Sequence, residues 1–197
     1  MAIGTTKLNA VNTMLSYVGE APVNSLSDPR PTDVAIAEAV LDEVSRAVQT
    51  EGWDFNTECE VTLSPDVSGE IVVPPDTLTV KATSRWATKL TLRGNRLFNI
   101  EDRNFTWTSD VEVDLVRELP FEDMPDPAKQ YVLRRAAREF RERVTDDPRD
   151  RAPSEPELRA LGRLMNFEHE SSDHRMSDAY SVGRITRRQS PMDGHRQ

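Results

Sequence analysis

Apolar residues recur at helical spacing at the start of the chain. One stripe, with members three or four positions apart, consists of Leu8, Val11, Leu15 and Val18. Gly19 and Pro22 predict the end of this helix, because glycine suits the left-handed C′ position and proline cannot continue a helix. A second amphipathic helix is expected up to Gly52, with Thr32 or Asp33 as its N-cap. The chain therefore begins with a predicted helical hairpin.

In the middle third of the chain the apolar period changes to two, the spacing of β-strands. Short runs rich in Val, Ile, Thr and Leu cover residues 57–63, 71–73, 77–82, 89–93, 96–100 and 111–116. Gly94-Asn95 separates two alternating segments, which indicates a hairpin. Residues 111–115 alternate strictly, so one face is expected in the core and the other, with Glu112 and Asp114, in solvent. This region predicts a small antiparallel sheet.

Helical spacing then returns. Asp126 is the expected N-cap of a third helix, and Pro127 occupies the first turn, where proline is tolerated. The core stripe of this helix is expected to contain Leu133, Ala136, Ala137, Phe140 and Val144. Ser154 and Glu157 have the spacing of a capping box and predict a fourth helix. Its expected apolar face consists of Leu158, Leu161 and Met165.

These elements predict an α+β fold, in which a helical domain similar to a four-helix bundle carries an inserted antiparallel β domain. The helical domain is expected to be discontinuous, from residues 1–52 and 120–170, and the β domain to span residues 53–119. Residues 171–197 show no apolar period, so they cannot bury a core alone. We interpret them as an extended C-terminal arm that orders against a neighbour. An ordinary disordered terminus is the alternative.

Charge is distributed unevenly along the chain. The formal net charge is -9, but residues 175–197 contain five Arg and two Asp, which gives +3 and leaves -12 on residues 1–174. An acidic body argues against a dedicated nucleic-acid binder, because such proteins replace phosphate counterions with Lys and Arg. A basic arm on an acidic body suits a head-to-tail contact between identical copies, which closes into a ring when the rotation permits.

The sequence contains none of the usual catalytic motifs: a phosphate-binding loop, GxGxxG, GxSxG and HExxH are all missing. His169 and His174 are five positions apart, so they lie on different sides of a helix. Cys59 is the single cysteine and has no evident His partner. We therefore expect no enzymatic activity, no cofactor and no metal. We also expect no signal peptide and no membrane span, because no apolar run approaches about 20 residues.

Several residues are candidates for protein interfaces. Trp107 lies in a polar loop, where an interface explains a large aromatic side chain better than solvent does; a place in the core is the alternative. Arg134 and Arg135 have fewer acidic neighbours than Arg138 and Arg141, which we expect to pair with nearby glutamates on a solvated helix face. The candidates in the arm are Arg184, Ile185, Arg187 and Arg188.

A series of motifs over about residues 8–145 resembles the tail tubular protein A family of short-tailed phages. In chain order these are Gly19-Glu20-Ala21-Pro22, Gly52-Trp53-Asp54-Phe55, Leu63-Ser64-Pro65-Asp66 and Arg135-Ala136-Ala137-Arg138-Glu139-Phe140. The resemblance implies a gatekeeper ring of about twelve copies in the virion tail, assembled in the host cytoplasm. Its implied partners are the portal protein, the nozzle protein (tail tubular protein B) and tail fibres, while DNA passes through the channel without specific binding.

Two other functions remain open at the level of sequence. The first is another neck or head-completion protein, which is usually more purely helical. The second is a nucleic-acid-binding packaging factor, which would show salt-dependent binding to DNA.

Overall fold

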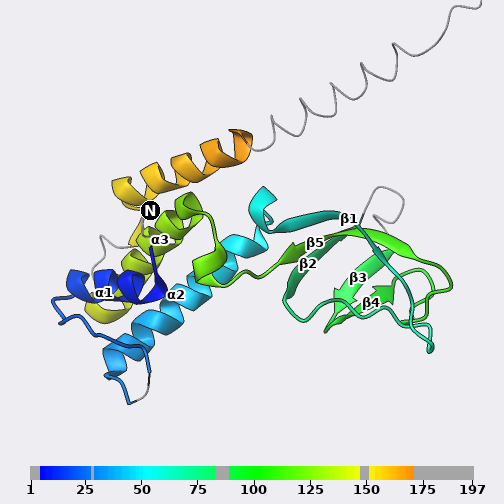
Figure 1. Cartoon of the computed structure of the whole chain (residues 1–197), viewed down its shortest axis with the longest axis horizontal. Helices are drawn as coiled ribbons and strands as arrows, with labels where there is room; N and C mark the ends of the chain where they lie inside the picture. The colour runs from blue at the N-terminus through cyan, green and yellow to red at the C-terminus, as the bar shows by residue number, and fades with distance from the viewer. Residues whose placement is uncertain (1–4, 28, 83–88, 147–150, 171–197) are drawn as a thin grey trace, which may run out of the picture.

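The computed structural model describes residues 5–27, 29–82, 89–146 and 151–170. These residues form an α+β fold with four helices and small antiparallel sheets, so the predicted fold class is confirmed. The helices gather at one end of the molecule and the strands at the other (Figure 1).

The first two helices begin and end close to the predicted positions. Helix α1 spans Lys7–Tyr17, and the Asn9 amide donates to Oγ1 of Thr6 at 3.2 Å, as expected for an N-cap. Helix α2 spans Thr32–Thr50. The N-cap position of α2 is Pro31, which makes no side-chain cap bond, so the prediction of Thr32 or Asp33 was wrong. Asp33 instead lies in the first turn, where a carboxylate interacts favourably with the helix dipole.

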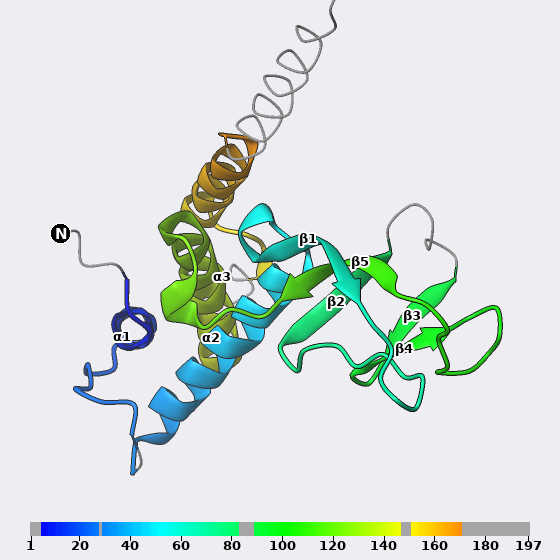
Figure 2. The same ribbon diagram turned by 45° about the vertical axis from the view of Figure 1, so that its right-hand side comes forward.

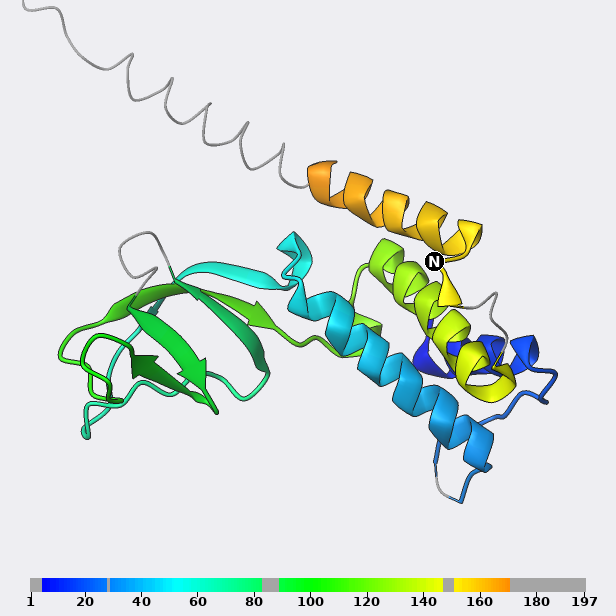
Figure 3. The same ribbon diagram turned by 180° about the vertical axis from the view of Figure 1, so that it is seen from behind.

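Helix α3 spans Asp126–Thr145, and a further helix covers residues 155–170. Pro125, and not Asp126 as predicted, occupies the N-cap position of α3. The helix ends at Asp146, whose backbone is left-handed and whose amide donates to the Glu142 carbonyl at 2.9 Å. Figure 3 shows α3 lying between α2 and the helix over residues 155–170.

The four helices enclose one apolar cluster, called here the helical cluster. Its larger members are Met14, Leu15, Leu41, Phe121, Phe140 and Leu164. Two predictions about the core were wrong. Val144 is exposed near the end of α3. In the helix over residues 155–170, Leu161 packs against the cluster as predicted, but Ala160 and Leu164 are buried while Leu158 and Met165 are about half exposed. This helix is thus rotated by about one residue, or about 100°, from the predicted orientation.

The strands form two antiparallel groups. In the first, β1 (Thr57–Leu63) and β2 (Thr77–Ala82) lie on either side of β5 (Val111–Arg117). In the second, β3 (Leu90–Arg93) and β4 (Arg96–Asn99) form the predicted hairpin, with Gly94 at a φ of 64° in its turn. Residues 71–73 form no separate strand. They make an isolated bridge between Val72 and Arg96 and backbone hydrogen bonds beside β4.

Both strand groups pack on a second apolar cluster, called here the β cluster. Its buried members are Ile71, Val73, Leu90, Leu97, Trp107, Val111, Val113 and Leu115. The alternation predicted for β5 is confirmed, because Val111, Val113 and Leu115 are buried while Glu112 is exposed.

Strand β1 lies at the edge of its sheet and is irregular. Its pairing with β5 shifts between Glu58 and Val61, as in a β-bulge. Within this bulge Glu60 has a φ of 56°, and its amide donates to Oδ1 of Asp114 at 2.8 Å. The free thiol of Cys59 is exposed in the same segment.

Buried polar side chains join the helices to the sheet. Gln49 is fully buried; its amide group donates to the Leu119 carbonyl at 3.1 Å and accepts from the Leu119 amide at 2.7 Å. Asn56 donates to the carbonyls of both Gln49 and Arg117. The chain passes between the helical end and the sheet in two places, and these bonds link the two segments. Figure 2 shows α2 pointing toward β1 at this junction.

Candidate protein interface

The described residues contain no group of three His, Cys, Asp or Glu side chains that is arranged to hold a metal ion. His169 is exposed at the end of the last described helix, and His174 lies outside the described residues. None of the described helices has both the length and the apolar character needed to cross a membrane.

Most of the arginines on α3 have carboxylate partners. The Arg135 Nε atom lies 3.0 Å from Oε1 of Glu139, one turn along the same helix. Burial is the largest single effect and lowers the pKa of Arg135, but the hydrogen bonds and charges of Glu139 and Tyr131 together outweigh it, so the net shift is upward. Arg143 crosses to α2, where Nη2 lies 2.8 Å from Oε2 of Glu43. Arg135 thus fits the interpretation of a solvated helix face, because Glu139 on the same helix balances its charge.

Arg138 forms a buried ion pair with the last described helix. Its Nε atom lies 2.8 Å from Oε2 of Glu157, and the two side chains are only 13% and 4% exposed. The hydrogen bond with Glu157 raises the pKa of Arg138, against the opposing effect of burial. Glu139 and Glu142, the partners expected from sequence, are farther away at 3.5 and 3.9 Å. The main partner is therefore a residue that was predicted only to cap a helix.

Arg134 differs from its neighbours on α3. Its Nη1 atom donates to the Tyr17 hydroxyl at 2.5 Å, which joins α3 to the end of α1. Within the described part of the chain, no carboxylate pairs with Arg134. The Tyr17 hydroxyl is neutral, so this hydrogen bond does not balance the positive charge of Arg134. Arg134 is thus better placed than Arg135 to meet an acidic partner.

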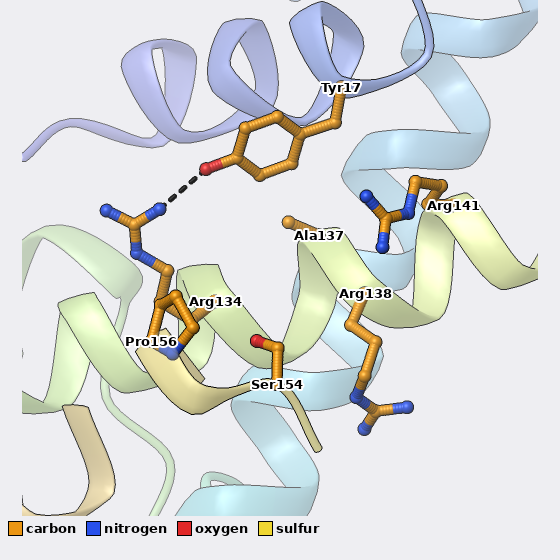
Figure 4. A pocket seen from close by; sticks show the side chains of 7 residues that line it. All are labelled: Tyr17, Arg134, Ala137, Arg138, Arg141, Ser154 and Pro156. Carbon is orange, nitrogen blue, oxygen red and sulfur yellow. Dashed lines mark hydrogen bonds between the residues drawn. The ribbon is translucent and has the colours of Figure 1, made fainter. Parts of the chain in front are cut away.

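A pocket of about 190 Å³ opens beside this pair (Figure 4). Tyr17 from α1 and Arg134 from α3 lie on one side of it, and Arg141 projects farther along α3. The segment that leads into the last described helix also lines the pocket, with Ser154 and Pro156. The pocket therefore combines guanidinium and hydroxyl donors, which suits a carboxylate-bearing protein segment.

A second pocket, of about 450 Å³, lies where the helices meet the sheet. Its charged lining residues are Lys7, Asp42, Asp76, Glu118 and Glu122. Several of these carboxylates are already in ion pairs: Asp42 with Lys7, Asp76 with Arg117, and Glu118 with Arg46. The groove is nevertheless acidic overall, which suits a basic protein segment.

Trp107, another predicted interface residue, does not lie on this surface. Trp107 is 5% exposed in the β cluster, and its indole N–H donates to the Leu97 carbonyl at 3.0 Å. This position matches the core interpretation, because little of the ring is available to a partner. Arg184, Ile185, Arg187 and Arg188 lie outside the described residues.

Comparison with known proteins adds two findings. Residues 8–174 match the model of a family described as tail tubular protein. The chain is also 31% identical, over 127 residues, to "Tail tubular protein A" of Klebsiella phage KP34. That alignment covers 64% of this chain and 66% of the relative, just under two thirds of the relative's length. These matches agree with the resemblance seen in the ordered motifs.

Proposed function

Because the chain belongs to the tail tubular protein family, whose members are structural proteins of the phage tail, we propose that it is a subunit of the ring-shaped adaptor between portal and tail nozzle. In this role the ring forms part of the DNA ejection channel. Its partners are further copies of itself, twelve in the complete ring, the portal protein above, and the nozzle protein (tail tubular protein B) below, with tail fibres near that junction. Assembly takes place in the host cytoplasm.

The observation that carries this proposal is the family match over residues 8–174. It includes every described helix and strand, so the relationship applies to the helical end and to the sheet alike. In our proposal, residues 1–52 and 120–170 form one bundle-like domain, residues 53–119 an inserted β domain, and residues 171–197 an arm.

The distribution of charge supports a conduit in preference to a DNA-binding protein. Residues 1–174 carry a net charge of -12, and most α3 arginines are paired with carboxylates. Each phosphate that a protein neutralises adds affinity for DNA. A channel that releases its genome quickly should offer few such contacts, so an acidic bore suits rapid passage.

Contacts between copies would use surfaces of opposite charge. A closed ring needs two different patches on each subunit, because its contacts are head-to-tail. The basic arm supplies one patch, and the acidic groove where the helices meet the sheet supplies a complementary one. The Arg134–Tyr17 pocket is a second basic patch, suited to an acidic segment of a neighbour.

Negative-stain electron microscopy of the purified protein, alone and mixed with portal, tests the proposal. We expect rings of uniform diameter that sit coaxially on the portal. Persistent monomers with no binding to portal would contradict an adaptor role. DNA binding by the isolated protein that weakens steeply with salt would support a packaging factor instead.

A further inference from the structure

The outer face of the β3–β4 hairpin carries an unusual group of side chains. Leu90, Leu92 and Leu97 point inward, since they pack in or against the β cluster. Successive side chains of a strand alternate between its two faces, and the hairpin register places Arg93 opposite Arg96. Arg93, Arg96 and Phe98 therefore share the outer face, away from the β cluster.

These side chains form an interleaved stack. The Arg93 guanidinium carbon lies 3.6 Å from the centre of the Phe98 ring, and that of Arg96 lies 4.3 Å from the centre of Phe105. The two rings meet edge to face, with centroids 5.1 Å apart and an interplanar angle of 75°. Cation–π contacts hold each guanidinium group over a ring, so part of its conformational freedom is already lost before binding.

The two arginines differ in charge balance. Arg96 is paired with Glu70, whose carboxylate oxygens both lie 2.8 Å from Arg96 Nη1. Arg93 has no carboxylate partner within the described residues, and its side chain is exposed. The face therefore carries one uncompensated, pre-oriented positive charge.

Apolar side chains complete the surface. Val72, bridged to Arg96, is 52% exposed, and Ile100, just beyond β4, is 45% exposed. Phe98 is only 8% exposed, so it positions Arg93 and offers little of its own ring to a partner. Arginine and aromatic residues are enriched at protein interfaces. We call this surface the arginine–aromatic face; its members are Val72, Arg93, Arg96, Phe98, Ile100 and Phe105.

The opposite side of the β cluster has the complementary charge. Val111, Val113 and Leu115 of β5 point into the cluster, so Glu112 and Asp114 lie on the outer face of the β1–β5–β2 sheet. The exposed Glu60 joins them, through its backbone bond to Asp114. Lys81 of β2 pairs in register with Asp114 and is exposed on the same face, so the three carboxylates outnumber one lysine there. We call Glu60, Glu112 and Asp114 the acidic face. It differs from the arginine–aromatic face, and a head-to-tail contact needs two different patches on each subunit.

We propose that the arginine–aromatic face binds the acidic face of the next copy of this chain. The inference rests on the proposed ring and names a surface that closes it. A protein partner fits better than DNA because half-exposed aliphatic side chains accompany a single unpaired arginine, whereas phosphate binding needs several cations. Charge complementarity selects a second copy, since the acidic face is displayed by every subunit.

Charge reversal on each face provides the test. Arg93→Glu, and separately Glu60→Lys combined with Glu112→Lys, should each weaken association between copies by about tenfold or more, because like charges would face each other. Combining all three changes should restore rings toward the wild-type level. Association is measured by sedimentation velocity and ring counts in electron micrographs, with circular dichroism as the check on folding. Arg159→Glu, the same reversal on an exposed helical residue, is the control and should leave ring formation unchanged.

The outcomes separate this inference from the ring itself. If the wild type forms rings and Arg93→Glu forms them equally well, the inference is wrong while the adaptor role stands. Failure of the triple variant to recover, with folding intact, would also overturn it. Arg93→Glu that keeps rings but loses DNA binding would assign this face to nucleic acid. If the wild type neither forms rings nor binds portal, both proposals fail together.

Discussion

Glu157 occupies the third position after Ser154, as in a capping box, yet its carboxylate binds Arg138. The backbone half of the capping box is present, because the Glu157 amide donates to Oγ of Ser154 at 3.4 Å. Its side chain, however, is almost fully buried beside Arg138. A buried carboxylate is costly without a cation, so this ion pair fixes how the last described helix sits on α3.

Arg138→Met tests that role at the scale of a single residue. The change leaves Glu157 buried without its cation, which should lower the free energy of unfolding by about 3 kcal/mol. Urea denaturation followed by circular dichroism measures the loss. Arg159→Met is the control, because Arg159 is exposed and, among the described residues, pairs with Glu155 alone; it should cost less than about 0.5 kcal/mol. Equal losses in the two variants would show that the Arg138–Glu157 pair stabilises the fold no more than an exposed ion pair does.

The Asp76–Arg117 ion pair makes stability depend on pH. Asp76 Oδ2 lies 2.6 Å from Arg117 Nη2, and this hydrogen bond holds the pKa of Asp76 below its usual value. A carboxyl whose pKa is lower in the folded state stabilises the fold above the unfolded pKa of about 4. That stabilisation is lost as the pH falls through the folded pKa.

We therefore expect Asp76→Asn to lose less stability than the wild type when the pH is lowered from about 5 to about 3. Urea midpoints across this range measure the difference. Arg117→Met should flatten the profile in the same way, because it removes the donor that lowers the Asp76 pKa. An unchanged slope in both variants would contradict this account.

At the scale of elements, regular periodicity was predictable from sequence and the choice of neighbour was not. The strict alternation in β5 and the Gly94-Asn95 turn predict a buried strand and a hairpin, because each signal lies within a few residues. Local sequence signals did not predict which face of the last described helix is exposed. Both Leu158 and Leu164 belong to apolar stripes, and only contact with α3 decides that Leu164 is buried.

The interface candidates show the same limit. Arg135–Glu139 is an i, i+4 pair that helical geometry makes visible, whereas Arg138–Glu157 joins residues 19 positions apart. The stack of Arg93 and Arg96 on Phe98 and Phe105 also depends on tertiary contacts. The Arg-Gly-Asn-Arg hairpin, followed by Phe98, was the one local sign of it.

Gln49 connects elements that are distant in sequence. Gln49→Leu should leave the Leu119 amide and carbonyl without their buried partners, at a cost of about 2–3 kcal/mol in unfolding free energy. Thermal and urea unfolding measure the cost. Gln130→Leu is the control, because within the described part of the chain the Gln130 side chain bonds to the Thr5 hydroxyl alone, in a less buried position. A Gln49 variant as stable as this control would show that the junction does not depend on these bonds.

At the scale of the whole molecule, two apolar clusters and a charged exterior define a subunit built for assembly. The helical cluster and the β cluster are separate, and polar side chains join the parts between them. The clusters and the junction described here are built from residues within 5–170. We therefore expect this fold to persist in a chain truncated before Ser171.

Truncation before Ser171 separates folding from assembly. We expect unchanged thermal unfolding, but weaker ring formation, because the basic segment would no longer reach the acidic surface of a neighbour. Calorimetry and ring counts at equal concentration measure the two effects. Rings that form as readily without residues 171–197 would show that the arm is dispensable.

The irregular edge of β1 affects how subunits behave before they assemble. An unpaired strand edge is a template for uncontrolled β-aggregation, which is a hazard for a protein made in many copies. The bulge between Glu58 and Val61, with the left-handed Glu60, interrupts that template with acidic side chains. The bulge thus disfavours polymerisation by strand addition. Contacts between copies would then depend on side chains.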